Sequence, residues 1–219
     1  MKPEPRRLPR GCNLFWDLSF DTGSTIYDRS GQATGDGVVV GATLIPGPTG
    51  LVRWYDGTDD TIYCPNGSIQ GSTEHTFAAW VANTMDAPWS HFVGYVGTLD
   101  LNLGTLEDGK LSLVSADAAI MTTVEEPFLF GDGTWRHIAH TYDAVRGNLI
   151  YIDGEVAPVA APDAVDYAGA YRCAYFAGFA GAPFGGAIGE AFHCNLALGA
   201  GEISRYYLES CKKFFGSVL

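Results

Sequence analysis

The stretch GTWRHIAHTYD at residues 133–143, followed by LIYIDG at residues 149–154, decides the fold of this chain. Its apolar segments, residues 135–142 and 149–152, are short and rich in the aromatic and β-branched residues that favour strands. The Asp-Gly pair that closes the second segment is the strongest short hairpin signal, because both residues tolerate positive φ. We therefore predict two strands, the second of which turns tightly into a third at Glu155-Val156.

The same pattern recurs along the chain. Leucines alternate with polar residues over residues 99–103 and 110–114, with Glu107-Asp108-Gly109 between them, which predicts a hairpin. Residues 77–81 predict a further strand. Helical periodicity appears only over residues 200–209, where we expect one or two turns packed on the sheets.

Composition supports a mainly β domain. The 219 residues include 28 Gly and 11 Pro, with 47% hydrophobic and 17% charged residues, which is too apolar for disorder and too rich in glycine for a helical bundle. We predict an all-β, antiparallel, two-sheet β-sandwich with one short C-terminal helix. Its expected parts are a basic, proline-rich arm at residues 1–12, the sandwich at residues 13–210 and an apolar tail at residues 211–219.

Charge is distributed unevenly. The formal net charge is −12, yet the arm carries Arg6, Arg7 and Arg10, so the sandwich is more acidic than the whole chain. An acidic body repels nucleic acid and anionic lipid, and we expect neither as a partner. The apolar runs are too short to span a membrane, and the N-terminus does not resemble a secretory signal. We expect the three arginines to contact partner subunits; the alternative is a disordered terminus.

The five cysteines are widely scattered and include no C-x-x-C pair. Such spacing predicts neither a zinc site nor a disulfide framework. We expect buried free thiols in a protein made in a reducing compartment, with partial disulfide bonding as the alternative.

A family resemblance rests on four stretches in a fixed order, which together cover most of residues 14–209. They are FDTGS with YDRSG (residues 20–31), LVRWYDGTDD with FAAWV (51–81), the stretch quoted first (133–154), and FGGAIGE with NLAL (184–198). This order resembles the laminin-G-like domains among the concanavalin A-like lectin and glucanase jelly rolls. The resemblance implies two sheets packed face to face in a usually non-catalytic domain that binds sugars, proteins or neighbouring modules.

The resemblance also implies a calcium ion near the opening acidic loop, where Asp21 and Asp28 are the candidate ligands. The family's Ile-Asp-Glu segment, however, has Gly189 in place of the aspartate, which removes one hard anionic ligand. We therefore expect no cofactor, and we interpret the acidic loop residues, with Asp59 and Asp60, mainly as turn formers.

Catalysis is not expected. Jelly-roll glycosidases use two carboxylates on one face of a strand, whereas Glu125 and Glu126 are adjacent and point to opposite faces. His137 and His140 lie three positions apart on a strand, so they cannot converge on one metal ion, and we expect His140 to be a hydrogen-bonded core or edge residue. A Ser-His-Asp arrangement remains open, although the sequence lacks the G-x-S-x-G elbow that would support one.

Aromatic residues are the remaining candidates for recognition, because flat rings stack on sugar faces and anchor protein interfaces. Trp80 and Trp135 lie within predicted strands and are expected to pack in the core. Trp54, Tyr55 and Trp89 lie nearer turns and are the candidate ligand-binding residues.

Two kinds of function fit this organisation. We expect first a virion surface protein, a capsid decoration or tail component of a tailed phage, made in the host cytoplasm and docked on other virion subunits as part of an oligomer or assembly. A single module with a basic arm, unpaired cysteines, no secretory signal and an apolar end motivates that expectation. The alternative is an extracellular, lectin-like carbohydrate-binding module, and a glycoside hydrolase is the least favoured.

Overall fold

The computed structural model describes residues 8–32, 35–48, 50–65, 74–84, 90–96, 101–105, 110–115, 120–124, 132–160, 173–176 and 183–216. These described residues form seventeen strands and one helix. In chain order the elements are β1 (Cys12–Asp17), β2 (Thr25–Ile26), β3 (Gly37–Val40), β4 (Thr43–Gly47), β5 (Gly50–Asp56), β6 (Thr61–Tyr63), β7 (His75–Asn83), β8 (Ser90–Val96), β9 (Leu101–Thr105), β10 (Leu111–Ser115), β11 (Ile120–Val124), β12 (Arg136–Asp143), β13 (Gly147–Ile152), β14 (Glu155–Val156), β15 (Val159–Ala160), β16 (Cys173–Phe176), β17 (Gly185–Cys194) and α1 (Ala200–Phe215).

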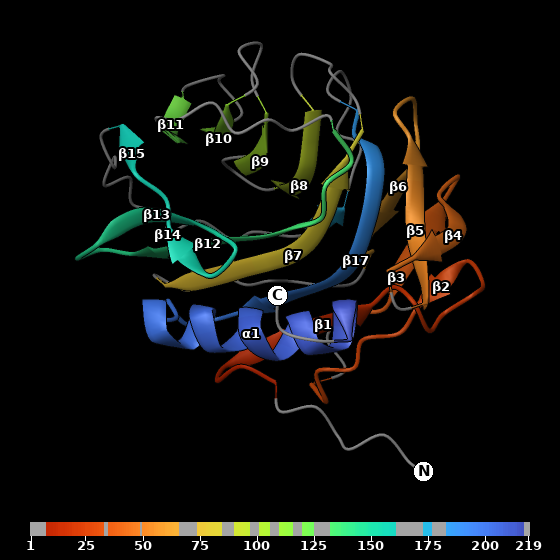
Figure 1. Ribbon diagram of the computed structural model, residues 1–219, viewed down its shortest axis with the longest axis horizontal. Coiled ribbons are helices and arrows are strands. Elements are labelled where there is room, and N and C mark those ends of the chain that lie inside the picture. Colours follow the sequence, from red (N-terminus) through yellow and green to blue (C-terminus); the bar gives the residue numbers. More distant parts are fainter. Residues whose placement is uncertain are drawn as a thin grey trace.

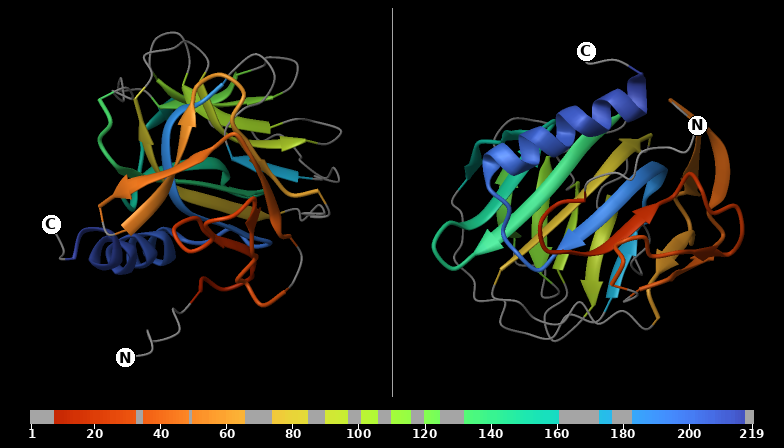
Figure 2. Two further views of the ribbon diagram at one scale, coloured as in Figure 1. Left: turned by 90° about the vertical axis from the view of Figure 1, so that its right-hand side faces the viewer. Right: turned by 90° about the horizontal axis from the view of Figure 1, so that it is seen from below.

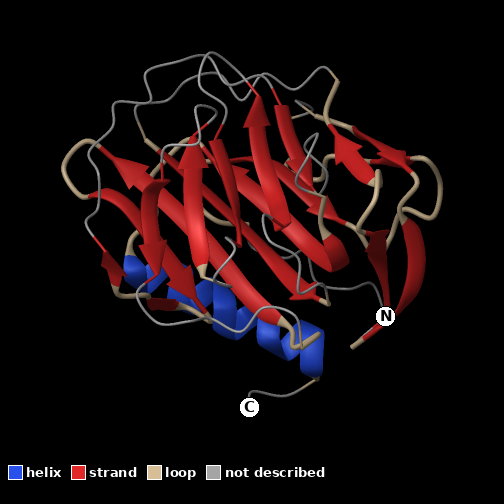
Figure 3. Ribbon diagram, turned by 90° about the horizontal axis from the view of Figure 1, so that it is seen from above, coloured by secondary structure: helices blue, strands red, loops and turns tan. Residues whose placement is uncertain are grey.

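The strands form two antiparallel sheets stacked face to face, and α1 covers the outer side of one of them (Figure 1). Sheet A has the order β14-β13-β12-β7-β17-β5-β4, with β1 also paired to β17. Sheet B has the order β15-β11-β10-β9-β8-β16-β6-β3-β2. Seen from above, the strands of the two sheets overlie one another and the helix lies beneath them (Figure 3). The predicted two-sheet β-sandwich with a C-terminal helix is confirmed.

The stretch that decided the fold, together with Glu155-Val156 after it, forms three consecutive strands of sheet A. Strands β12 and β13 are antiparallel, with Ile138 opposite Ile152, and β13 returns as β14. Between β13 and β14 the φ angles are 51° at Asp153 and 84° at Gly154. Two positive values are what a tight hairpin turn requires, and the Asp-Gly pair supplies them at low cost. The hairpin of β9 and β10, with Leu103 opposite Leu113, is confirmed as well.

Strand β17 lies at the centre of sheet A and has three partners. Strand β7 pairs along one edge, while β5 and β1 share the other, β5 along residues 185–188 and β1 along residues 190–194. The register shifts between Ile188 and Ala191. Every residue of β7 and β17 is buried because the sandwich core covers one face of these strands and α1 the other.

The main core lies between the sheets. Its largest fully buried side chains include Trp16, Tyr55, Phe77, Phe92 and Phe184. Full burial of side chains of this size stabilises the fold by about 1.5–3 kcal/mol each.

Helix α1 forms a third layer on sheet A (Figure 2, right). The carboxylate of Glu202 accepts a hydrogen bond from the N–H of Gly199 at 3.0 Å and caps the first turn. Gly216, at a φ of 74°, ends the helix with its N–H donating to the carbonyl of Lys212. The helix is longer than expected, since it takes in residues 211–215 of the predicted tail. No helix among the described residues is long and apolar enough to cross a membrane.

A second aromatic layer joins α1 to sheet A. The indole of Trp80 is 1% exposed, stacks on Phe214 at 5.0 Å between ring centroids, and donates a hydrogen bond to the hydroxyl of Ser210 at 2.9 Å. Trp135 is half-buried and lies 5.2 Å from the same phenyl ring. The prediction that Trp80 packs in the interior is confirmed, although its partner is the helix and not sheet B.

The end of the N-terminal arm belongs to the folded domain. Leu8 packs against the cluster between β1 and α1, and Cys12 already lies in β1. Arg10 is ion-paired with Glu202 of α1 at 3.6 Å. The predicted arm boundary at residue 12 is therefore too late, because residues 8–12 already contact the domain. Arg6 and Arg7 lie outside the described residues.

Candidate functional site

The loop that follows β1 is organised by the carboxylate of Asp21, which is only 8% exposed. One oxygen accepts a hydrogen bond from the Arg29 guanidinium at 2.7 Å, and the other accepts the N–H of Tyr27 at 2.9 Å. From the sheet side, the buried guanidinium of Arg53 donates to the carbonyls of Asp21 and Gly23. These bonds fix the loop before any ligand arrives.

Asp28 performs a similar role one turn later. Its Oδ1 accepts the N–H groups of Phe15 at 3.0 Å and Ser30 at 2.9 Å, while its Oδ2 accepts the hydroxyl of Ser30 at 2.9 Å. The oxygens of Asp28 are thus bonded to groups of the protein, as are those of Asp21.

Calcium does not fit this pair. Ca²⁺ needs six to eight oxygen ligands, whereas Asp21 is already neutralised by the Arg29 cation and Asp28 is occupied by backbone and hydroxyl donors. The candidate assignment of Asp21 and Asp28 as metal ligands is corrected here, because both carboxylates shape the loop.

Gly189 has a packing explanation. A Cβ atom built there would lie 2.1 Å from Cζ of Phe214, the helix residue that stacks on Trp80. Helix α1 therefore fills the space that an aspartate at this position would need.

Asp56, Asp59 and Asp60 are the one acidic group among the described residues that gathers closely, with ligand atoms within 4.8 Å of one another. Asp60 accepts the N–H of Asp56, and Asp56 accepts the N–H of Thr58, both at 2.8 Å. Burial raises the pKa of Asp60, and the neighbouring carboxylates add to that effect. These hydrogen bonds form a turn, as the sequence predicted for Asp59 and Asp60.

Of the predicted ligand-binding aromatic residues, Tyr55 is buried in the core, so the prediction for this residue is wrong. Its side chain is 0% exposed in the core, with its ring 5.7 Å from that of Phe184. It cannot contact a ligand at the surface, because alternation along β5 turns it inward and the preceding Trp54 outward. Trp54 is half-buried on the outer face of sheet A, packed against Ala82 and Ala187. Trp89 lies outside the described residues.

Exposed aromatic residues instead lie on both sides of β2, Phe20 in the turn after β1 and Tyr27 directly after β2. Phe20 is 62% exposed and Tyr27 is 55% exposed. The Arg29 guanidinium lies 5.4 Å from the Phe20 ring centroid while it pairs with Asp21. We call Phe20, Tyr27 and Arg29 the aromatic platform. Sequence reasoning used these residues only as markers of the fold; the available signal was two aromatic residues within an Asp-, Ser- and Gly-rich loop.

The two histidines of β12 face opposite sides of sheet A, as predicted. The ring of His137 lies 5.6 Å from that of Tyr206 in the layer beneath α1. His140 faces sheet B and bonds Asn148 through Nε2 at 2.9 Å. His140 is thus a hydrogen-bonded core residue.

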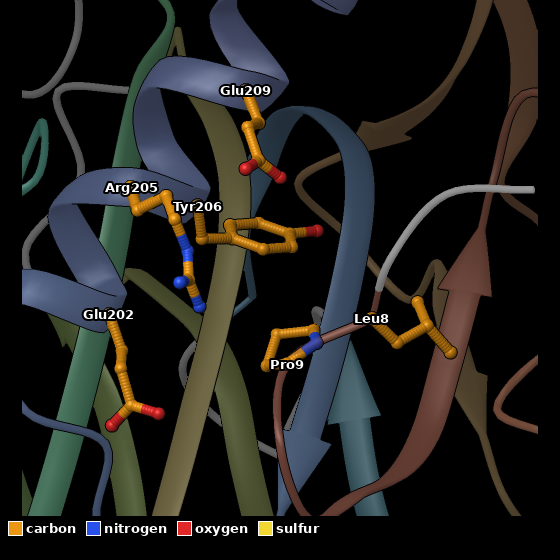
Figure 4. Close-up of a pocket in the computed structure, with 6 residues that line it drawn as sticks. All are labelled: Leu8, Pro9, Glu202, Arg205, Tyr206 and Glu209. Carbon is orange, nitrogen blue, oxygen red and sulfur yellow. The ribbon is translucent and has the colours of Figure 1, made fainter.

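A narrow seam lies between α1 and the N-terminal segment (Figure 4). Leu8 and Pro9 form one side, and Glu202, Arg205, Tyr206 and Glu209 form the other. Its volume is about 50 Å³, far below the roughly 300 Å³ at which ligand pockets begin. The seam is a packing contact between α1 and the N-terminal segment, and its volume is too small for a sugar ring.

The buried acidic residues beside this seam are not arranged for glycoside hydrolysis. Asp17 and Glu190 are register partners across β1 and β17. They are 5% and 1% exposed, and the hydroxyl of Tyr206 donates to Glu190 at 3.0 Å. A sugar cannot reach between two carboxylates that the fold encloses.

The sequence matches the family model described as the concanavalin A-like lectin/glucanases superfamily over residues 56–204, which is most of the chain. The chain belongs to this superfamily. The resemblance that the four stretches indicated is therefore confirmed. No relative matches among curated proteins.

Solved structures share the jelly roll of the superfamily at low sequence identity. Domain 4 of AbnA, a GH43 extracellular arabinanase from Geobacillus stearothermophilus in complex with arabinotriose, has a TM-score of 0.73 and 17% identity, over 90% of this chain and 98% of that one. The binding domain of Paraclostridial Mosquitocidal Protein 1 has a TM-score of 0.71 and 15% identity, over 91% and 52%. A Trypanosoma rangeli sialidase has a TM-score of 0.67 and 16% identity, over 91% and 33%. This chain thus spans about half of the second structure and a third of the sialidase, and these likenesses show the fold alone.

Proposed function

We propose that the chain is a non-catalytic carbohydrate-binding domain and that the aromatic platform contacts the glycan. The observation that carries this proposal is a pair of exposed rings on the segment between β1 and β3, which partly buried hydrogen bonds hold in place. Rings stack on the apolar faces of sugars, and a guanidinium donates to their hydroxyl groups. A rigid loop loses little conformational entropy on binding, which favours affinity.

Two further points support this proposal. The similar arabinanase domain is in complex with arabinotriose, which makes an arabino-oligosaccharide a sensible first probe. The enclosed positions of Asp17 and Glu190 support binding without hydrolysis.

The first test is a glycan-array screen of the full chain, followed by calorimetric titration of the best glycan and of arabinotriose. We expect the double variant Phe20→Ala, Tyr27→Ala to bind at least about tenfold more weakly, because each stacked ring contributes roughly 0.5–1.5 kcal/mol beyond its buried area. Val145→Ser, on the exposed turn between β12 and β13, is the matched control and should bind as the wild type does.

Two results would count against the proposal. Absence of binding to every glycan at high micromolar concentration, with and without Ca²⁺, would overturn glycan recognition. A wild-type affinity in the double variant, with a loss in Trp54→Ala, would move the site to the outer face of sheet A.

Docking on the subunits of a virion is a second candidate function. The location of this protein on a phage surface remains a prediction. The feature that favours docking is Arg10, whose side chain is 70% exposed beside Glu202 of α1. Deletion of residues 1–7 should abolish assembly into a larger particle while leaving the far-ultraviolet circular dichroism unchanged. Normal assembly of the shortened chain would contradict a docking role for the arm.

A further inference from the structure

Two cysteines face each other where the first strand meets the central strand of sheet A. Cys12 and Cys194 are direct register partners in the antiparallel pair of β1 and β17. Directly opposed residues in antiparallel strands have Cα atoms about 4.5–5.5 Å apart, and a disulfide accepts about 4.4–6.8 Å. The register shifts between Cys12 and Leu14, so the pair lies at an irregular step of the ladder, and the pairing of β1 with β17 brings the two cysteines close to this range.

The side chains are also suitably disposed. The Cys12 thiol donates a hydrogen bond to the carbonyl of Leu14 at 3.3 Å, and the neighbouring Cys12 thiol, with burial, raises the pKa of Cys194. Cys12 is half-buried and Cys194 is buried. An oxidant can therefore reach the Cys12 sulfur from the solvent, whereas the Cys194 sulfur lies in the interior.

The other described thiols lie in separate layers. Cys64 belongs to the core between the sheets, and Cys211 lies on α1 and packs with Trp80 and Phe214. Neither shares the cluster that contains Cys194 and contacts Cys12. Among these thiols, only Cys12 and Cys194 are paired by the fold.

We propose that Cys12 and Cys194 form a redox-active dithiol that a low-molecular-weight disulfide, such as oxidised glutathione, converts into a cross-strand disulfide. The Cys12 thiolate attacks one glutathione sulfur, and the first glutathione leaves and takes up a proton. Cys194 then loses its proton and attacks the Cys12 sulfur, which expels the second glutathione. Two protein thiols lose two electrons, and one glutathione disulfide gains them.

The disulfide would fasten β1, and hence the start of the aromatic platform loop, to the centre of sheet A. It would close a loop containing nearly the whole domain, and long loops gain the most from a cross-link. We expect the melting temperature of the oxidised form to exceed that of the reduced form by at least about 5 °C. This inference does not depend on glycan binding.

The test uses the full-length chain, reduced and then incubated with excess oxidised glutathione. Remaining thiols are blocked with N-ethylmaleimide in guanidinium chloride, and the chain is cleaved by trypsin and a glutamate-specific protease without reduction. These cuts place Cys12 in residues 11–29 and Cys194 in residues 191–202, apart from the other cysteines. Mass spectrometry should find these two peptides joined.

Two variants complete the experiment. Cys12→Ser should leave Cys194 blocked by maleimide and remove the increase in melting temperature, whereas Cys211→Ser should still form the joined peptides. Blocking of both cysteines in the wild type, glutathione left on Cys12, or a bond from Cys12 to a different cysteine would each overturn the proposal.

Discussion

Replacing Gly189 with aspartate should lower the free energy of unfolding by about 4 kcal/mol or more. The new Cβ would meet the Phe214 ring at 2.1 Å, and the carboxylate would lie in the aromatic layer between sheet A and α1. Overpacking a core costs about 1–3 kcal/mol, and a buried charge without a partner costs several more. Urea unfolding followed by tryptophan fluorescence measures the loss, because Trp80 lies in that layer.

A matched control separates the site from the substitution. Gly201 has no neighbouring atom within 4 Å of its built Cβ and lies in the first turn of α1, where a negative charge is favourable. Gly201→Asp should therefore leave stability unchanged within about 0.5 kcal/mol. In the Gly189→Asp background, Phe214→Ala should recover part of the loss by opening space. If the Gly189→Asp protein were as stable as the wild type, α1 would not pack closely against β17 in solution.

Acidification should destabilise the protein steeply between pH 6.5 and about pH 4. Three buried histidines, His75, His140 and His193, lie together on the inner face of sheet A, with ring centroids 5.1 Å apart between the first two and 6.3 Å between His75 and His193. Burial lowers the pKa of His140 to about 4 and that of His193 to about 3. Burial, reinforced by the other two rings, holds the pKa of His75 well below its ordinary value.

The sign follows from proton uptake. In this pH range the unfolded chain protonates these side chains and the folded protein does not, so protons favour unfolding and stability falls with falling pH. Each histidine contributes about 1.4 kcal/mol per pH unit to the slope. The free energy of unfolding measured in urea at pH 7, 6 and 5 should show this dependence.

Removing one titrating ring gives the control for the acid effect. His140→Gln keeps a polar group near Asn148 and should reduce the slope by about 1.4 kcal/mol per pH unit. A wild-type stability that is flat from pH 7 to pH 5 would show that these side chains are not held neutral in the core.

The end of the C-terminal helix could be predicted from the sequence. Gly216 ends α1 in the left-handed conformation, and a glycine after two apolar residues was a stop signal available in the sequence. That Tyr55 points into the core while Trp54 points outward was not predictable in the same way. Period-two alternation separates the faces of a strand but does not say which face the second sheet will cover.

The sequence by itself determined the all-β class, the tight turn at Asp153-Gly154 and the opposite orientation of His137 and His140. Each of these follows from the preferences of residues close together in the chain. Only the tertiary structure decided that Arg29 neutralises Asp21, that Phe214 excludes a side chain at Gly189 and that Cys12 meets Cys194. Two of these contacts join strands or layers that are distant in sequence, and all three depend on register and packing, which no local pattern encodes.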